Sequence, residues 1–134
     1  MFQIKGKMGE TNVHIVAEDA ADLVEAVEMG VAAGIQEFYA VNLNTSIKEV
    51  IRNDKSEQGI WYMGTIRETI MIEDPDGKRK PKSKKVRYNI LLQADSIEEA
   101  TAIFSEQLQQ GYDAIARSIK ETDIFDVICH NPQV

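Results

Sequence analysis

The sequence predicts an α+β fold, in which tandem duplicated ββαβα repeats form one pseudo-twofold domain with a mostly antiparallel sheet and helices on one face. The first observation is internal similarity, because residues 13–51 and 90–128 align without a gap at a constant offset of 77. Apolar and acidic positions recur in register, as does a glycine at Gly34 and Gly111. The second observation is periodicity, since each repeat combines period-two runs with one run of helical spacing. A unit of about 50 residues is too small to stand alone. We therefore expect a shared core, with the two sheets joined edge to edge or packed face to face.

The first repeat, residues 1–52, begins with a predicted hairpin. Apolar and polar residues alternate on both sides of a short turn that contains Gly9. Glu18 and Asp19 are placed to begin a helix, and Gly34 is placed to end it in a left-handed conformation. The predicted elements are strands at 2–8 and 13–17, a helix with apolar positions from Leu23 to Val31, a strand at 37–43 and a short helix at 46–52.

The second repeat, residues 60–128, follows the same plan after a polar linker at 53–59 and precedes a C-terminal tail at 129–134. Asp95 or Ser96 is expected to cap its helix. The predicted elements are a strand at 60–72, a return strand from about Lys84, a helix with apolar positions from Ile97 to Leu108 that Gly111 ends, a strand at 113–120 and a short helix at 123–128.

The hairpin of the second repeat carries a long, strongly basic segment at 73–85, where the first repeat has only a short turn. Seven of the 15 Lys and Arg residues lie between residues 78 and 87, and no acidic residue is among them. The other 8 face all 22 acidic residues, so the net charge is −7 overall and −14 outside this run. Pro75 to Gly77 indicates a turn, and Pro81 discourages regular pairing. The sequence therefore predicts a mobile, basic hairpin tip on an acidic protein.

Such a cluster of cations is typical of phosphate binding, because polyanions neutralise the mutual repulsion of the cations and release counterions. Aromatic side chains on the flanking strands are suited to stacking on unpaired bases. Trp61 is expected to be exposed, whereas Tyr62 and Tyr88 fall on the apolar face of the alternation. The alternative interpretation is a solvated loop that keeps the protein soluble and protects a sheet edge. The predicted nucleic-acid-binding residues are Lys78, Arg79, Lys80, Lys82, Lys84, Lys85, Arg87, Arg67, Trp61 and Tyr88.

Other chemistry has little support, and we expect a protein that is not an enzyme and uses no cofactor. Cys129 and His130 are neighbours in the sequence, whereas catalytic pairs are usually assembled from distant segments. His14 has no Cys or carboxylate at ligand spacing, so no metal site is predicted. The single cysteine excludes an internal disulfide. Because the chain has no apolar run of about 18 residues and no secretory signal, we expect a cytoplasmic protein that does not span a membrane.

Several features of the second repeat together are similar to one family. They are Trp61–Tyr62, Arg67, Gly77–Lys78, Lys84–Lys85, Tyr88, Ala94–Ala100 and Ile119–Lys120. On these features, residues 60–128 resemble a small family of uncharacterised domains found in gut anaerobes and their bacteriophages. The resemblance implies a bacterial or phage-infected cytoplasm, and it supplies no activity and no catalytic residues. The first repeat lacks the aromatic opening and the basic hairpin.

These observations favour a non-enzymatic nucleic-acid-binding protein, such as a phage single-stranded DNA-binding or replication accessory protein, that uses its basic hairpin. One alternative is a protein-interaction module, such as a phage regulatory or anti-defence factor, that acts through its acidic surface. The other is a small-ligand-binding dimer that uses the groove between repeats. An exposed sheet edge makes a homo-oligomer compatible with each of the three.

Overall fold

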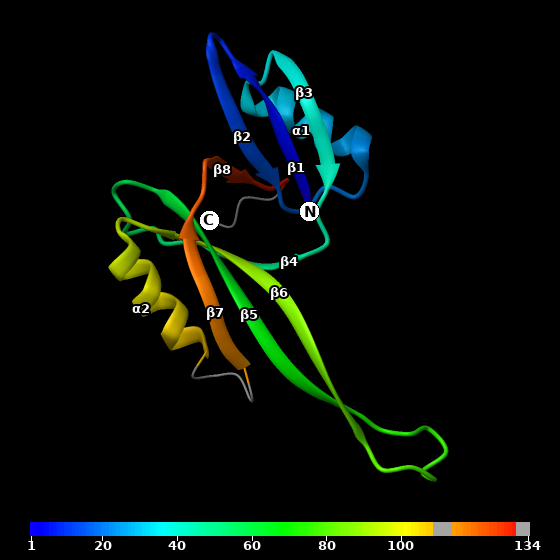
Figure 1. The fold of residues 1–134 in the computed structure, drawn as a ribbon. Helices are drawn as coiled ribbons and strands as arrows, with labels where there is room; N and C mark the ends of the chain where they lie inside the picture. The colour runs from blue at the N-terminus through cyan, green and yellow to red at the C-terminus, as the bar shows by residue number, and fades with distance from the viewer. Residues whose placement is uncertain (109–113, 131–134) are drawn as a thin grey trace. The chain divides into compact units, whose positions relative to one another are not determined.

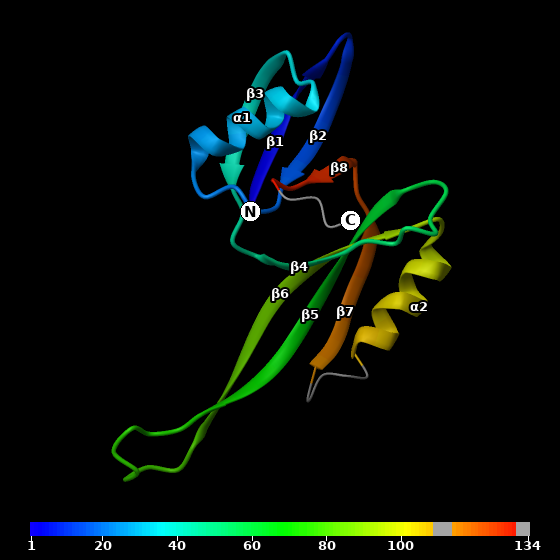
Figure 2. The same cartoon turned by 180° about the vertical axis from the view of Figure 1, so that it is seen from behind.

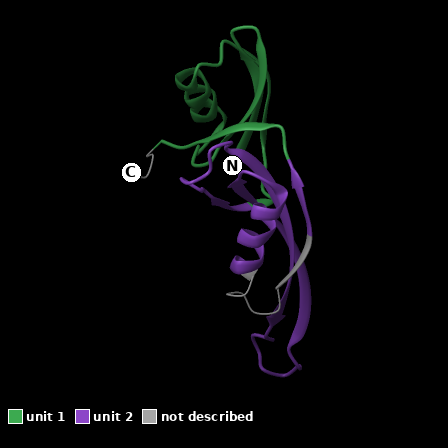
Figure 3. Ribbon diagram, turned by 90° about the vertical axis from the view of Figure 1, so that its left-hand side faces the viewer, with its two compact units in different colours: residues 1–47, 122–134 green, residues 48–121 purple. Residues whose placement is uncertain are grey.

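The computed structural model describes residues 1–108 and 114–130 of the chain. It divides the chain into two compact units, one of residues 1–47 and 122–134 and the other of residues 48–121 (Figure 3). In the described residues, each unit holds a four-stranded sheet and one helix (Figure 1). The predicted α+β class and the mostly antiparallel pairing are confirmed.

The sheet of the first unit has the strand order β3-β1-β2-β8. Strand β1 pairs antiparallel with β2 and β3, and β8 lies parallel to β2. The elements are β1 (Phe2–Met8), β2 (Thr11–Ala17), α1 (Leu23–Ala33), β3 (Glu37–Leu43) and β8 (Ile124–Ile128).

The predicted alternation of the first hairpin is confirmed by its burial. Ile4 and Ile15 lie directly opposite each other on β1 and β2, and both are fully buried. Lys5, the next residue on β1, is exposed. Helix α1 covers the apolar face through Ala26 and Met29. Burial of a large aliphatic side chain stabilises a fold by about 1.5–3 kcal/mol, so this face holds the first unit together.

Helix α1 begins later than the sequence predicts. Its N-cap is Asp22, whose side chain accepts a hydrogen bond from the Glu25 N–H at 2.8 Å, and not Glu18 or Asp19. The predicted end is confirmed, since Gly34 follows the helix with a φ of 109°. A left-handed backbone of this kind favours glycine, which has no Cβ.

The sheet of the second unit has the strand order β4-β6-β5-β7. Helix α2 packs on one face of this sheet, where Phe104 joins a core that contains Tyr62 and Leu92. Gly64 permits this close approach, because a Cβ there would lie 2.6 Å from Cε2 of Phe104. The predicted helix end at Gly111 lies outside the described residues. The elements are β4 (Ile47–Ile51), β5 (Ile60–Ile72), β6 (Lys82–Ala94), α2 (Ile97–Leu108) and β7 (Ala114–Glu121).

The final segment of each repeat is a strand, so the prediction of short helices at 46–52 and 123–128 is wrong. The two segments, Ile47–Ile51 and Ile124–Ile128, are five residues long and rich in β-branched side chains, which favour strands. Helices this short have little stability of their own. By contrast, β8 pairs with β2, and β4 joins a sheet beside β6.

This pairing exchanges the last strands of the two predicted repeats. Strand β4, from residues 1–52, belongs to the sheet of the second unit, and β8, from residues 60–128, belongs to that of the first. The compact units therefore divide the chain differently from the repeats. Where a shared core was expected, the described residues form separate clusters around Ile15 and around Leu92.

The predicted linker at 53–59 lies inside the second unit and is held there by Asp95. The Asp95 carboxylate accepts hydrogen bonds from the Ser56 hydroxyl at 2.6 Å and from the Gln58 N–H at 2.7 Å. Both hydrogen bonds lower the pKa of Asp95, and the bond from Ser56 has the larger effect. The helix cap is Ser96, whose hydroxyl accepts a hydrogen bond from the Glu99 N–H at 3.2 Å.

Candidate nucleic-acid interface

The predicted long hairpin is present and extends beyond the rest of its sheet. Strands β5 and β6 pair from Ile60 with Ala94 to Ile72 with Lys82. Among the described residues, by contrast, the pairing of β7 with β5 ends at Glu68. In Figures 1 and 2 the two long strands continue past the end of β7. We call residues 69–85 the arm, and its paired part, residues 69–72 and 82–85, the distal ribbon.

The tip of the arm is organised by Asp74, a residue that the sequence analysis did not single out. Its carboxylate accepts hydrogen bonds from the Asp76 N–H at 3.1 Å and the Arg79 N–H at 3.0 Å. Its main-chain carbonyl accepts one from the Gly77 N–H at 3.0 Å. Gly77 has a φ of 66°, which suits glycine. Asp before Pro-Asp-Gly is a turn signal, and here it sets the direction in which the basic return segment leaves the tip.

All seven side chains of the basic run are exposed. Within residues 1–108 and 114–130, none of them forms an ion pair with a carboxylate. Lys78, Arg79 and Lys80 lie in the tip, and the other four lie on β6. The seven cations are therefore open to an external anion.

Arg67 and Arg87 lie directly opposite each other on β5 and β6. Arg67 is half-buried, whereas Arg87 is exposed. Like charges at directly opposite positions destabilise a strand pair. Both residues were predicted to bind nucleic acid, but their register did not follow from the sequence. An anion bound at this point would relieve the repulsion.

The predicted exposure of Trp61 is wrong, because only 2% of the residue is exposed. Alternation places Trp61 on the face opposite Tyr62, but both residues are buried. Leu91, which lies opposite Met63 on β6, is fully buried too. Both faces of the proximal hairpin are covered, so alternation there does not indicate exposure. In this structure the Trp61 indole is not available for stacking.

Tyr88 is half-buried and packs against the core of the second unit. Burial raises the pKa of its hydroxyl, with further contributions from Glu68 and Glu49. Burial likewise raises the pKa of Tyr62. No aromatic residue occurs between residues 69 and 87. The arm therefore presents cations without aromatic side chains. Of the two aromatic residues predicted to bind on the flanking strands, Trp61 is buried and Tyr88 is half-buried.

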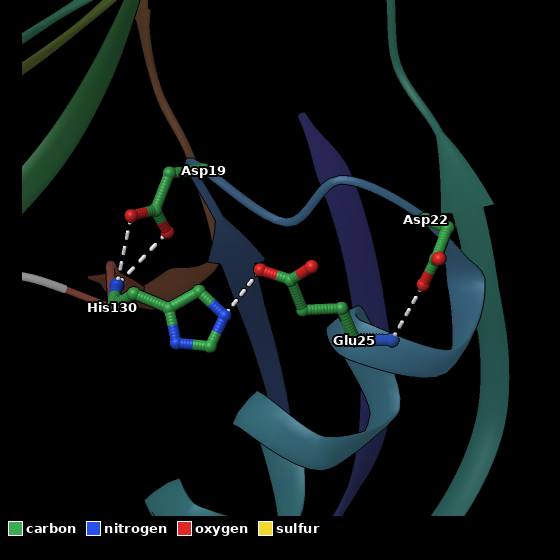
Figure 4. Close-up of polar contacts among 4 residues, drawn as sticks. All are labelled: Asp19, Asp22, Glu25 and His130. Carbon is green, nitrogen blue, oxygen red and sulfur yellow. Dashed lines mark hydrogen bonds and ion pairs between the residues drawn. The ribbon is translucent and has the colours of Figure 1, made fainter.

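The histidines take part in structural contacts of the first unit. The His130 N–H donates to both carboxylate oxygens of Asp19, at 2.9 and 3.0 Å, and its Nε2 forms an ion pair with Glu25 (Figure 4). His14 Nδ1 lies 2.8 Å from Asp123 Oδ1, and this hydrogen bond lowers the pKa of Asp123. These contacts attach residues on both sides of β8 to the first unit.

A hollow of about 340 Å³ is lined by residues of α1 and by Ile128, Cys129 and His130. Cys129 is partly buried there and forms no disulfide. In the described part of the chain, no group of three or more His, Cys, Asp or Glu side chains is placed to hold a metal ion. Glu28 also lines the hollow, and Glu25 forms an ion pair with Nε2 of His130.

Comparison with known protein families identifies a match for this chain. No curated protein and no solved structure matches the chain. Within the described residues, no helix combines the length and the apolar character needed to cross a membrane. The match is to a family described as "Domain of unknown function (DUF4494)", over residues 15–130. It covers the second repeat and the first repeat from residue 15 on, where the resemblance was expected only in the second. This chain therefore belongs to the DUF4494 family of uncharacterised domains.

Proposed function

We propose that the protein is a non-enzymatic nucleic-acid-binding protein that holds phosphates with its arm. The observation that carries the proposal is the exposure of seven cations on a projecting hairpin, none of them paired with a carboxylate in the described residues. Cations so close together repel one another, and a nucleic acid backbone neutralises them with release of its condensed counterions.

The rest of the chain restricts where a nucleic acid can bind. Outside residues 78–87 the net charge is −14, so a phosphate backbone is repelled from most of the surface and attracted to one hairpin. A single-stranded preference rested on Trp61 as a stacking platform, and the burial of Trp61 removes that support. The seven cations of residues 78–87 carry the proposal alone.

The experiment measures binding of a labelled oligonucleotide by fluorescence anisotropy across a salt series. If all seven cations contact phosphates of a duplex, the logarithm of the association constant should fall with the logarithm of salt with a slope of about −6. Affinity should therefore drop by about a thousandfold or more between about 50 and about 200 mM salt.

A variant with Lys78, Arg79, Lys80 and Lys82 changed to Ala should bind more weakly and reduce the slope by about 4. A matched control removes four exposed lysines outside the arm and so changes the net charge equally. It carries Lys5→Ala, Lys48→Ala, Lys55→Ala and Lys120→Ala, and it should keep the slope of the unmodified protein. Equal loss in both variants would show that net charge and not the arm determines binding, and would end the proposal.

We also propose that the chain arose by tandem duplication. When β1–β4 are matched with β5–β8 in chain order, the sheet β3-β1-β2-β8 corresponds to β7-β5-β6-β4. The same arrangement thus occurs twice, with the last strand supplied by the other repeat. The proposal accounts for the alignment of residues 13–51 with 90–128 as well as for the exchange.

The biological setting is a proposal of the same kind. We place the protein in the cytoplasm of a gut anaerobe or of its phage-infected host, where a replication accessory role suits a nucleic-acid-binding protein without enzymatic activity. Sheet edges at β3 and β7 offer surfaces for a homo-oligomer. Fractionation of an expressing host and measurement of molecular mass in solution test these two statements.

A further inference from the structure

Within residues 1–108 and 114–130, the distal ribbon is an antiparallel pair with no third strand on its β5 side. Its four directly opposite pairs run from Thr69 with Lys85 to Ile72 with Lys82. The pairing of β7 with β5 ends at Glu68, one residue before the ribbon begins. Every side chain of the ribbon except Thr69 is exposed, so both of its faces are open to a partner.

Each face of the ribbon combines apolar and cationic side chains, and one face also carries hydroxyl groups. Because side chains alternate along a strand, one face holds Ile70 and Ile72 opposite Lys84 and Lys82. The other face holds Thr69, Met71, Ser83 and Lys85. Three of the apolar residues are exposed, with exposed fractions of 37% for Ile70, 63% for Met71 and 48% for Ile72. Exposed apolar residues side by side, with cations opposite, suit a partner that is apolar in its centre and anionic at its edges.

The grooves of a nucleic acid duplex have this chemistry, since base edges and thymine methyl groups form the floor and phosphates form the rims. The major groove of B-form DNA is about 12 Å wide and admits a two-stranded ribbon. The strands of such a ribbon lie about 4.8 Å apart, and its side chains occupy about 5 Å on each face. The minor groove of unbent B-form DNA, at about 6 Å, is narrower than such a ribbon and would have to be widened by bending. The major groove of A-form RNA is closed to side chains.

We infer that the distal ribbon binds in the major groove of B-form duplex DNA, an inference that rests on the proposed nucleic-acid-binding function. Lys82, Lys84 and Lys85 contact the groove, Ile70, Met71 and Ile72 pack on base edges, and the cations of the tip hold the phosphate rim. No aromatic residue occurs within residues 69–87. This supports binding to a duplex, because proteins that bind single-stranded nucleic acid stack the unpaired bases on aromatic rings.

The test compares four labelled ligands of one sequence with the full-length protein: duplex DNA, each of its single strands, and duplex RNA. We expect the DNA duplex to bind at least about tenfold more tightly than either strand or the RNA duplex. Equal or tighter binding of a single strand, or equal binding of duplex RNA, would overturn the groove inference and leave the proposed function intact. Binding of none of the four ligands would overturn both.

Two apolar substitutions separate groove contacts from simple charge attraction. Met71→Ser together with Ile72→Ser should weaken binding of the DNA duplex by about fivefold to tenfold and leave its salt slope unchanged, because no charge is removed. Leu43→Ser, at a residue of β3 with 62% exposure, is the matched control and should change neither quantity. Unchanged affinity in the double variant, with circular dichroism equal to that of the unmodified protein, would overturn the groove inference.

Discussion

Replacement of Arg87 by Glu should stabilise the hairpin while it weakens nucleic acid binding. Arg87 lies directly opposite Arg67 in the register of β5 and β6, and directly opposite residues have Cβ atoms about 4.5–5.5 Å apart. In water, two unit charges about 5–10 Å apart interact with about 0.4–0.8 kcal/mol. The substitution changes a repulsion into an attraction. After screening by salt, we expect the free energy of unfolding to rise by about 0.5–1 kcal/mol.

The assay is urea unfolding at low and at high salt, because screening should abolish most of the gain. Lys84→Glu is the matched control, since it makes the same change of charge on the same strand opposite Ile70, which is uncharged. Both variants should lose affinity for duplex DNA, but only Arg87→Glu should gain the cross-strand ion pair. If Lys84→Glu stabilises the protein as much as Arg87→Glu does, the gain comes from net charge, and the reasoning from register is refuted.

Three further predictions concern the fold. Gly64→Ala should lower the free energy of unfolding by about 1–3 kcal/mol, because its Cβ would lie 2.6 Å from the ring of the buried Phe104. If urea unfolding shows a change near zero in this free energy, the packing described is contradicted. The hydrogen bond from His14 lowers the pKa of Asp123, so its stabilising effect is present above the ordinary aspartate pKa of about 4 and is lost as the pH falls through the lowered pKa. When the urea midpoint of unfolding is measured against pH, Asp123→Asn should accordingly make its fall at acidic pH less steep. An unchanged fall would show that the His14–Asp123 hydrogen bond does not contribute to the pH dependence. Cleavage at a protease site inserted within 53–59 should leave two fragments that co-elute without denaturant, because each fragment supplies a strand to the other's sheet. Separation of the fragments would show that the exchanged strands do not hold them together.

Alternation identified the parts of the fold where one face of a sheet is buried. Ile4 and Ile15 are buried and Lys5 is exposed, as a half-buried strand requires. Alternation did not predict the burial of Trp61. Both faces of the sheet are covered there, so the face on which a residue lies does not determine whether it is exposed. Pairing partners are not encoded in a five-residue segment, so the strand at 47–51 could be recognised as apolar and short but not as part of a sheet with the second repeat.

The charge of the arm was readable from the sequence because it depends only on composition. The register was not readable, since it is set by packing and turn geometry together. Arg67 was predicted as a binding residue and Arg87 as another, but their direct opposition follows only from the observed pairing. Asp74 was missed for a related reason: its neighbours Pro75 and Gly77 gave the turn signal, and the hydrogen bond that reaches Arg79 depends on the conformation of the whole tip.

The surface that the arm presents is determined well away from its tip. Strands β5 and β6 are the two inner strands of their sheet, and Tyr62 and Leu92 lie opposite each other in the buried core. A shift of one residue in this pairing would turn every side chain to the other face and expose the core. The core therefore fixes the alternation that places Ile70 opposite Lys84, in a ribbon that has too few strands to be stable alone. Substitutions in the core that loosen the register should impair binding even though no core residue touches a ligand, because the arm keeps its charge but loses its defined faces.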